Sequence, residues 1–315
     1  MEEITLSIII PTRNRAEYLD QCIKSILKSK FDENFEIIII DDQSEDATKI
    51  YDKNYLIKKF LFSNIDIYHT KERLMAIKAR NQGIKLSKAK KYILVIDDDN
   101  EIDEYMIKNL FNFAELNKTF GIIGPSMYYF DNKNKYLDYE KINFFTGRTK
   151  HIISKKKNNF YESDGVPNVY MIRTKLLQEY GLFDEKLIWF FEEPDFAFHL
   201  KQHGIKCCAI PEAITFHKVP SISFNYKNMG GKFPAAAYFL IRNRFVIIKR
   251  YANIFQKLIF IVFFSWLWPL LYSMIIFIES QRHDLIKLYW HGFKDGVYYF
   301  FTNKFRISIN LNKLE

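Results

Sequence analysis

The chain has 315 residues, 48% of them hydrophobic, which is enough to bury one sizeable domain and an extension. Its three cysteines, two of them adjacent at Cys207 and Cys208, exclude a disulfide framework and fit a reducing compartment. The acidic start and the early end of the first apolar run, at Pro11, predict that there is no signal peptide. The net charge of +9 would permit a nucleic-acid partner, but the basic residues gather in a polar loop and beside an apolar segment. No nucleic-acid partner is therefore predicted.

The first hundred residues alternate between apolar runs and helical spacing. Continuous aliphatic residues predict buried strands over 6–10, 36–40 and 92–96. After the first strand, apolar residues recur at the spacing of an amphipathic helix, which Asn14 would cap: Leu19, Cys22, Ile23, Ile26 and Leu27. This order of strands and helices predicts a doubly wound α/β domain with right-handed crossovers.

Acidic residues follow two of these predicted strands. Asp41 and Asp42 end the second, and Asp97, Asp98 and Asp99 end the third. Because parallel α/β sheets bind ligands at the carboxyl ends of their strands, we expect one shared cleft. Two carboxylates about 6 Å apart repel by roughly 3 kcal/mol at an effective dielectric near 20, and a bound divalent cation would offset this repulsion. If the segment is extended, the side chains of Asp97 and Asp99 point the same way. The alternative to a cation site is a solvated acidic turn that ends the strand.

The next predicted elements are a short helix and a strand. Pro194 suits a first helical turn and Gly204 ends the apolar pattern, so a helix is predicted to begin at Pro194. A strand is predicted over 207–210, and His217 follows it.

Residues 258–278 contain no charge and are long enough to span a bilayer. Basic residues precede the stretch, and Trp266 and Trp268 add aromatic surface. Basic residues also follow it, which conflicts with a single crossing, and Pro269 would allow a re-entrant hairpin or two in-plane helices. A buried core helix is the remaining alternative. The aromatic and basic tail is predicted to lie at the membrane interface, with both chain ends cytoplasmic.

Six segments resemble, in the right order, the successive signatures of family 2 glycosyltransferases. They are residues 7–15 (SIIIPTRNR), 40–48 (IDDQSEDAT), 79–83 (ARNQG), 95–99 (VIDDD), 181–185 (GLFDE) and 192–196 (EEPDF). Further along, Arg242-Asn243-Arg244, a hydrophobic stretch and a Gly-x-x-Asp-Gly element at 292–296 are similar to the rhamnosyltransferase-like group, whose members have a C-terminal membrane-associated segment.

The resemblance implies a GT-A fold, which is a Rossmann-like nucleotide-diphospho-sugar transferase domain, with a C-terminal hydrophobic helical region at the membrane. It implies inverting transfer from a nucleotide-sugar donor and a Mg²⁺ or Mn²⁺ ion. The ion would stabilise the charge that develops on the diphosphate leaving group. The implied metal ligands are Asp99, Asp97 and His217, and the implied donor-binding residues are Pro11, Thr12, Asn14, Asp42, Arg80, Asp97 and Asp98.

The acceptor hydroxyl must lose a proton, and Glu193 is the predicted catalytic base. The dipole of the predicted helix would keep its carboxylate ionised. The family's usual pair here is Glu-Asp, whereas this chain has Glu192-Glu193. The alternatives are that Glu193 only caps the helix, that His217 is a buried hydrogen-bonding residue and that Arg80 is a surface charge.

The predicted function is metal-dependent, inverting transfer of a hexosyl or deoxyhexosyl group to a glycan or lipid-linked acceptor at the cytoplasmic face of the membrane. The predicted parts are a catalytic domain (1–228), a basic juxtamembrane segment (229–257), a hydrophobic helix or re-entrant hairpin (258–278) and an amphipathic interfacial tail (279–315). The alternative is a non-catalytic, membrane-attached protein that binds glycans or nucleotide sugars. A nucleotidyltransferase is disfavoured because the loop at 11–15 has no glycine, and a processive synthase because there is no Gln-x-x-Arg-Trp element.

Overall fold

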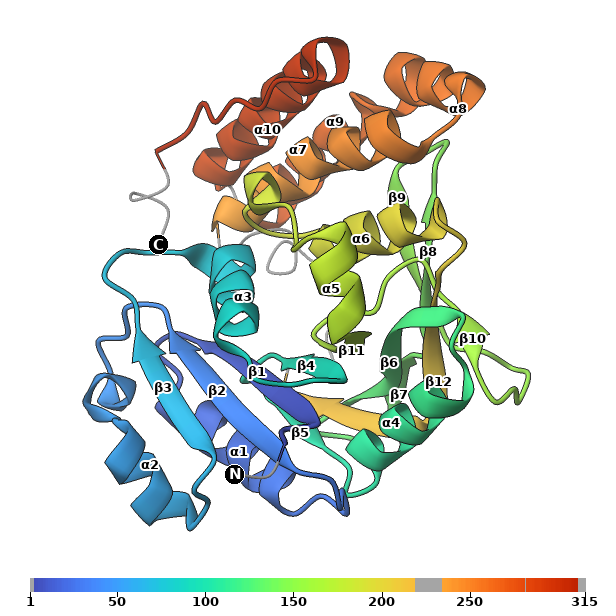
Figure 1. Ribbon diagram of the computed structural model, residues 1–315. Helices are drawn as coiled ribbons and strands as arrows, with labels where there is room; N and C mark the ends of the chain where they lie inside the picture. Colours follow the sequence, from blue (N-terminus) through green and yellow to red (C-terminus); the bar gives the residue numbers. More distant parts are fainter. Residues whose placement is uncertain (1–2, 219–233, 281, 311–315) are drawn as a thin grey trace. The chain divides into compact units, whose positions relative to one another are not determined.

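The computed structural model describes residues 3–218, 234–280 and 282–310 (Figure 1). The chain forms two compact units. The first unit comprises Met1–Lys141, His151–Glu185 and Phe196–Ser221, and the second comprises Ile142–Lys150, Lys186–Asp195 and Ile222–Glu315. The second unit therefore includes two segments from the middle of the chain. The four-part division made from the sequence stays a prediction.

A mixed ten-stranded sheet forms the centre of the first unit. Its order is β10-β12-β6-β11-β4-β1-β2-β3, with β5 paired to β12 and β7 to β6. The bounds are β1 Leu6–Thr12, β2 Phe35–Asp41, β3 Ile65–His69, β4 Tyr92–Ile96, β5 Asn100–Ile102, β6 Phe120–Tyr129, β7 Lys135–Leu137, β10 Tyr161–Glu162, β11 Val169–Arg173 and β12 Lys206–His217. Strands β1 to β4 are parallel, whereas β11 lies antiparallel between β4 and β6. A separate two-stranded sheet pairs β8 (Tyr139–Asn143) with β9 (Arg148–Ile152).

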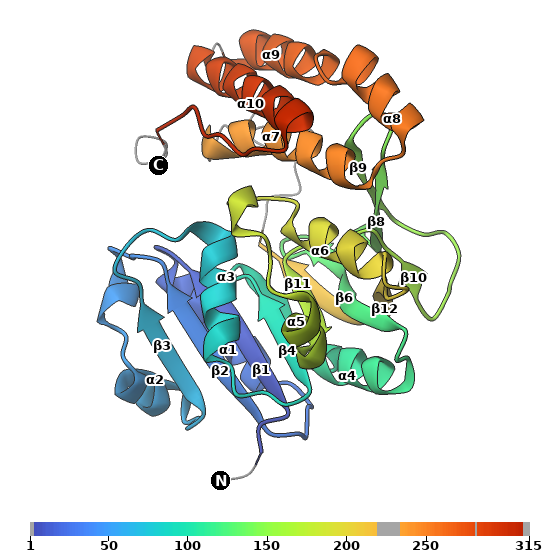
Figure 2. The same cartoon turned by 45° about the horizontal axis from the view of Figure 1, so that its top comes forward.

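Helices cover both faces of the central sheet, so successive residues 6–10 of β1 and all residues of β4 are buried. The helices are α1 Ala16–Leu27, α2 Lys53–Phe60, α3 Met75–Leu86, α4 Met106–Leu116, α5 Thr174–Tyr180 and α6 Glu192–Lys201, with 3-10 turns η1 Ala47–Ile50 and η2 Glu185–Leu187. Leu6, Ile8 and Ile10 share a core cluster with residues of α1, α2 and α4. Figure 2 shows α3 and α5 in front of the strands, where Gly83 of α3 lies against Ile9.

Two predicted helix starts are wrong. Asn14 does not cap α1, because Arg15 holds the capping position and Asn14 itself has a left-handed backbone (φ 52°). Helix α6 begins at Glu192 and not at Pro194. Proline is tolerated there because the first helical turn needs no backbone N–H donor. The predicted strand at 207–210 is the first part of the longer β12, which continues past a bulge to His217.

The described part of the second unit consists largely of helices: α7 Pro234–Tyr251, α8 Ile254–Ile259, the π-helical turn η4 Phe260–Phe264, α9 Leu267–Ser280 and α10 His283–Thr302. Helix α10 packs closely on α7 at two glycines. A Cβ atom at Gly292 would lie 2.4 Å from the carbonyl oxygen of Tyr238, and one at Gly296 would lie 2.3 Å from the ring of Phe245. Between them, the buried Asp295 accepts hydrogen bonds from Tyr238 Oη (2.5 Å) and Arg306 Nε (2.6 Å). The tail therefore folds against α7.

Residues Ile254–Glu279 are long and apolar enough to cross a membrane, with a mean hydropathy of 2.1. Only 28% of the most apolar window is buried, which argues against a core helix. Exposed apolar side chains recur along it: Val262, Phe263, Trp266, Leu270, Met274 and Phe277. Pro269 lies in the first turn of α9, where it need not break the helix. Whether the segment spans or re-enters a bilayer stays a prediction.

Candidate functional site

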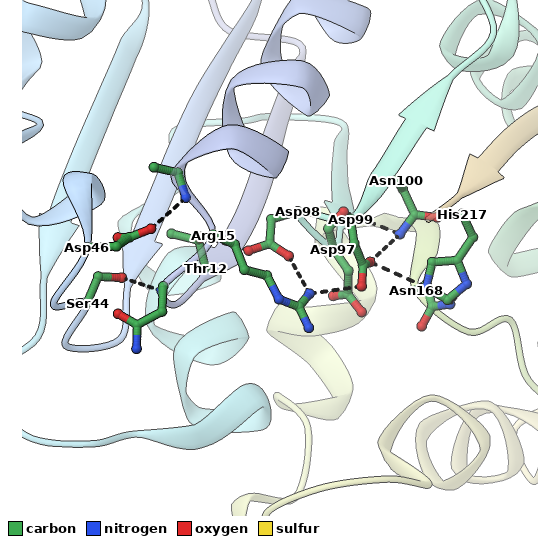
Figure 3. A network of polar contacts seen from close by, with 12 residues as sticks. Thr12, Arg15, Ser44, Asp46, Asp97, Asp98, Asp99, Asn100, Asn168 and His217 are labelled. Atoms are coloured by element: carbon green, nitrogen blue, oxygen red, sulfur yellow. Dashed lines mark hydrogen bonds and ion pairs between the residues drawn. The ribbon is translucent and has the colours of Figure 1, made fainter. Parts of the chain in front are cut away.

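The loop after β1 and the turn after β4 form a polar cluster in the first unit (Figure 3). Thr12 Oγ1 donates to Asp98 Oδ2 at 2.7 Å. Arg15 Nη1 donates to both Asp98 Oδ1 (2.9 Å) and Asp99 Oδ2 (2.8 Å), so one guanidinium neutralises two adjacent carboxylates. The sequence analysis included Arg15 in a motif but assigned it no role.

The aspartate triplet forms a turn and is not extended, because the backbone N–H of Asn100 donates to the carbonyl of Asp97 at 3.1 Å. Asp98 and Asp99 consequently share Arg15. Asp97 instead accepts two hydrogen bonds from Arg80 Nη2, at 2.7 and 3.0 Å. The extended conformation that would point Asp97 and Asp99 the same way is therefore absent, and their role as metal ligands stays a prediction. Arg80 is only 5% exposed, which rules out the surface-charge alternative for it.

The two carboxylates that share Arg15 differ in acidity. Burial raises the pKa of Asp98 well above its usual value, and the Asp99 charge adds to this while Arg15 opposes it. Burial acts in the same direction on Asp99, but the His217 hydrogen bond and the charges of His217 and Arg15 outweigh it and lower the pKa of Asp99. Asp99 is therefore an ionised carboxylate at neutral pH, which is the form that binds a cation.

His217, the last residue of β12, lies on the other side of this cluster from Arg15. Its Nε2 atom is 3.4 Å from Asp99 Oδ1. Its Nδ1 atom lies 2.8 Å from Tyr136 Oη and 3.4 Å from Asn168 Nδ2. Second partners of this kind fix the orientation of a metal-binding imidazole. None of the motifs described above contains Tyr136 or Asn168.

The donor chemistry fits a hard divalent ion. Asp99 and His217 supply one oxygen and one nitrogen close together, and Mg²⁺ or Mn²⁺ is commonly held by few protein ligands together with substrate phosphates. Within the described residues, no group of three or more His, Cys, Asp or Glu side chains is placed to hold a metal. An ion bound here would compete with Arg15 for Asp99.

The remaining predicted donor-binding residues lie at the ends of β1 and β2. Pro11 is within β1, and Asn14 binds the neighbouring loop, because its Oδ1 accepts from Glu45 N at 2.6 Å. Asp42 accepts hydrogen bonds from the side chain of Arg73 and from the backbone of Leu74 (2.6 Å) and Met75 (2.9 Å). Both Asp42 oxygens thus already have partners within the chain.

Glu193 is the second residue of α6 and belongs to the second unit. The backbone just before it is strained, since Ile188, Phe190 and Phe191 have φ angles of 65°, 66° and 70°. The buried side chain of Asn243 holds this segment. Its Nδ2 atom donates to the carbonyls of Leu187 (3.0 Å), Trp189 (2.7 Å) and Phe190 (3.1 Å).

Helix α7 also holds the residue two positions after Glu193. Arg250 Nη1 lies 2.8 Å from each carboxylate oxygen of Asp195, and Tyr251 Oη donates to Asp195 Oδ1 at 2.9 Å. Arg242 adds hydrogen bonds from Nη2 to the carbonyls of Lys186 and Leu187. The sequence analysis placed these residues in a basic juxtamembrane segment, which stays a prediction, and the structure shows that Arg242 is buried.

The chain is similar to known glycosyltransferases. It is 27% identical over 134 residues to "Glycosyltransferase GlyG" of Streptococcus pneumoniae, covering 42% of this chain and 43% of that protein. It is 27% identical over 286 residues to a dolichyl N-acetyl-alpha-D-glucosaminyl phosphate 3-beta-D-2,3-diacetamido-2,3-dideoxy-beta-D-glucuronosyltransferase of Methanococcus voltae, covering 87% of this chain and 83% of that one. The chain thus spans less than half of GlyG but most of the second relative.

The fold has solved counterparts. The structure of S. aureus TarS residues 1–349 in complex with UDP-GlcNAc superposes with a TM-score of 0.61 at 15% identity, covering 93% of this chain and 82% of that one. This likeness confirms the predicted GT-A fold. Residues 7–181, more than half of the chain, match the family described as Glycosyl transferase family 2. The chain therefore belongs to glycosyltransferase family 2.

Proposed function

We propose that this chain transfers a sugar from a nucleotide-sugar donor to a glycan or lipid-linked acceptor, with inversion and with a divalent metal. The observation that carries the proposal is the ionised Asp99 between Arg15 and His217 at the carboxyl end of β4. Asp99 and His217 would hold Mg²⁺ or Mn²⁺, and the ion would supply charge stabilisation for the departing diphosphate.

We assign separate roles to the other residues of the site. Asp97 holds the buried guanidinium of Arg80, whose charge suits a diphosphate. Thr12 holds Asp98, which we assign to the donor sugar or ribose. Glu193, in the first turn of α6, accepts the proton of the attacking acceptor hydroxyl.

We further propose that the enzyme acts at the cytoplasmic face of a membrane on a lipid-linked acceptor, as expected for the rhamnosyltransferase-like group. The apolar segment Ile254–Glu279 supports attachment. The name of the Methanococcus voltae relative describes a sugar linked to dolichyl phosphate. A cysteine introduced beside Glu315 should react with an impermeant reagent only from the cytoplasmic side of sealed vesicles, and labelling from outside would contradict this topology.

The decisive experiment on catalysis is Glu193→Gln. This variant should lose sugar transfer while nucleotide sugars with Mn²⁺ still raise its melting temperature, because the amide cannot accept the proton but leaves the donor site intact. Glu212→Gln, an exposed glutamate on β12, is the matched control and should transfer normally. Near-normal turnover by Glu193→Gln would overturn the assignment of the base.

The alternative, a binding protein without catalysis, predicts a different result. A transferase slowly hydrolyses its donor and releases nucleoside diphosphate when metal is present. The absence of such release across the common nucleotide sugars would favour the binding protein.

A further inference from the structure

The second unit contains a buried arginine whose hydrogen-bonding capacity is largely unused. Arg244 is 5% exposed. Its Nη2 atom is 3.5 Å from Tyr272 Oη, and its Nε and Nη1 atoms have no hydrogen-bond partner among the described residues. No carboxylate pairs with it in this described part of the chain. A guanidinium is always charged, so a buried one of this kind calls for an anion.

The surroundings are shaped to admit this side chain. Gly147, in the turn between β8 and β9, has a φ of 69°. A Cβ atom at Gly147 would lie 2.5 Å from Cγ and 2.6 Å from Cδ of Arg244. The guanidinium carbon of Arg244 lies 5.7 Å from the ring centre of Trp268 and 5.9 Å from that of Tyr272. The turn can therefore pass over the aliphatic part of Arg244 only because Gly147 has no side chain.

A second arginine contacts the same indole. The guanidinium carbon of Arg148 lies 5.1 Å from the ring centre of Trp268. Arg148 is exposed and has no ion pair among the residues that the structure describes. The indole itself is held in place, since Trp268 Nε1 donates to the carbonyl of Thr146 at 2.6 Å. Two cations that lack a carboxylate partner therefore meet at one aromatic side chain.

The side chains around Arg244 suit a ligand that is both anionic and apolar. Arginine forks match phosphate oxygens in geometry and charge. The turn that carries Gly147 and Arg148 also exposes Phe145, whose ring centre lies 6.1 Å from that of the exposed Phe255 of α8. A phosphate with an attached hydrocarbon chain would use both features, whereas a free anion would use only the first.

We propose that Arg244 and Arg148 bind the phosphate of a polyisoprenyl-phosphate-linked acceptor, whose hydrocarbon lies along the exposed rings of Phe145 and Phe255. The inference rests on the proposed function and names its acceptor class. It assigns to the second unit the recognition of the lipid phosphate.

Sedimentation of the full chain with vesicles tests this site. Phosphatidylcholine vesicles containing a polyisoprenyl phosphate should bind the chain more tightly than phosphatidylcholine alone. Arg148→Ala and Arg244→Lys should each weaken that difference by roughly tenfold or more, the effect expected for loss of a charge-assisted hydrogen bond. Arg282→Ala, which removes a cation of the same unit that pairs with Asp284, is the control and should bind as the parent does.

Three results would overturn the inference. The first is that both arginine variants bind the polyisoprenyl phosphate vesicles as tightly as the parent. The second is that the parent binds phosphatidylglycerol vesicles equally tightly, and the third is that inorganic phosphate competes fully and with the same affinity as the lipid. Arg148 is exposed, so its alanine variant keeps the test valid even if Arg244→Lys fails to fold. Donor hydrolysis by the parent chain without lipid separates a failure of this inference from a failure of the proposed transferase.

Discussion

Replacing Asn243 by alanine should both destabilise the protein and slow transfer. The side chain is fully buried, and its amide donates to the carbonyls of residues 187, 189 and 190. Its Oδ1 accepts from Arg242 Nε at 2.9 Å. Alanine removes these bonds and offers no donor in their place.

The magnitude follows from the contacts. Two amide hydrogens serve three carbonyls and Oδ1 accepts a third bond, so about three net hydrogen bonds are lost, at roughly 1 kcal/mol each. The Leu187 carbonyl keeps its bond from Arg242, but the carbonyls of Trp189 and Phe190 lose the donor that Asn243 supplies, which adds roughly 1–2 kcal/mol. The expected loss in free energy of unfolding is therefore about 4–5 kcal/mol. The left-handed residues at 188, 190 and 191 each store about 1 kcal/mol or more of strain, so the released segment should relax and displace Glu193.

Denaturant unfolding measures the first effect and steady-state kinetics the second. The kcat of Asn243→Ala should fall at least tenfold while the donor KM stays near that of the parent, because the donor residues lie on other loops. Asn253→Ala is the matched control: it removes the exposed cap of α8 in the same unit and should cost about 1 kcal/mol without changing kcat. If Asn243→Ala unfolds within about 0.5 kcal/mol of the parent, or keeps the parent kcat, the reasoning is refuted.

Three further predictions concern other contacts. Gly83→Ala places a Cβ atom 2.3 Å from Ile9 Cγ2 and should cost about 1–3 kcal/mol in denaturant unfolding; an unchanged midpoint would show that α3 shifts freely. Arg15→Ala leaves two adjacent carboxylates without their shared cation, so its melting temperature should fall without metal and rise more than the parent's on adding Mn²⁺; equal responses would argue against a cation site. The pKa of Asp295 is lowered on folding, because hydrogen bonds from Tyr238, Ser308 and Arg306 outweigh burial. Its stabilisation is therefore complete above about pH 4 and is lost as the pH falls through the folded pKa, so thermal melts of Asp295→Asn should show a shallower acid decline than those of the parent.

The parallel half of the fold could be predicted because its strands are continuous aliphatic runs. β1, β2 and β4 each contain the predicted range. The sequence did not predict that β11 would be antiparallel, since the direction of a short strand depends on its partners and not on its own residues. The helix starts predicted from Asn14 and Pro194 were wrong. A capping preference is worth only about 1 kcal/mol, and loop contacts such as that of Asn14 with Glu45 easily outweigh it.

The site could be predicted where residues belong to segments that resemble the family, as Arg80 and the aspartate triplet do. The aspartate triplet is one motif, but the turn that separates Asp97 from its neighbours could not be read from composition. Arg15 reaches the triplet from the loop after β1, and Tyr136 of β7 reaches His217, so only the folded chain identifies them. The contacts of the Arg-Asn-Arg motif could not be predicted, because a sequence does not say which arginines find backbone carbonyls to bind.

The second unit's use of two internal segments has a consequence for engineering. A fragment cut before α7 would retain 186–195 but lose the side chains that bind its carbonyls, and Asp195 would lose Arg250. A soluble version made by deleting the C-terminal helices should therefore be poorly active for reasons unrelated to the membrane. Chimaeras between relatives should exchange the helices together with residues 142–150 and 186–195, since these three stretches form one compact unit.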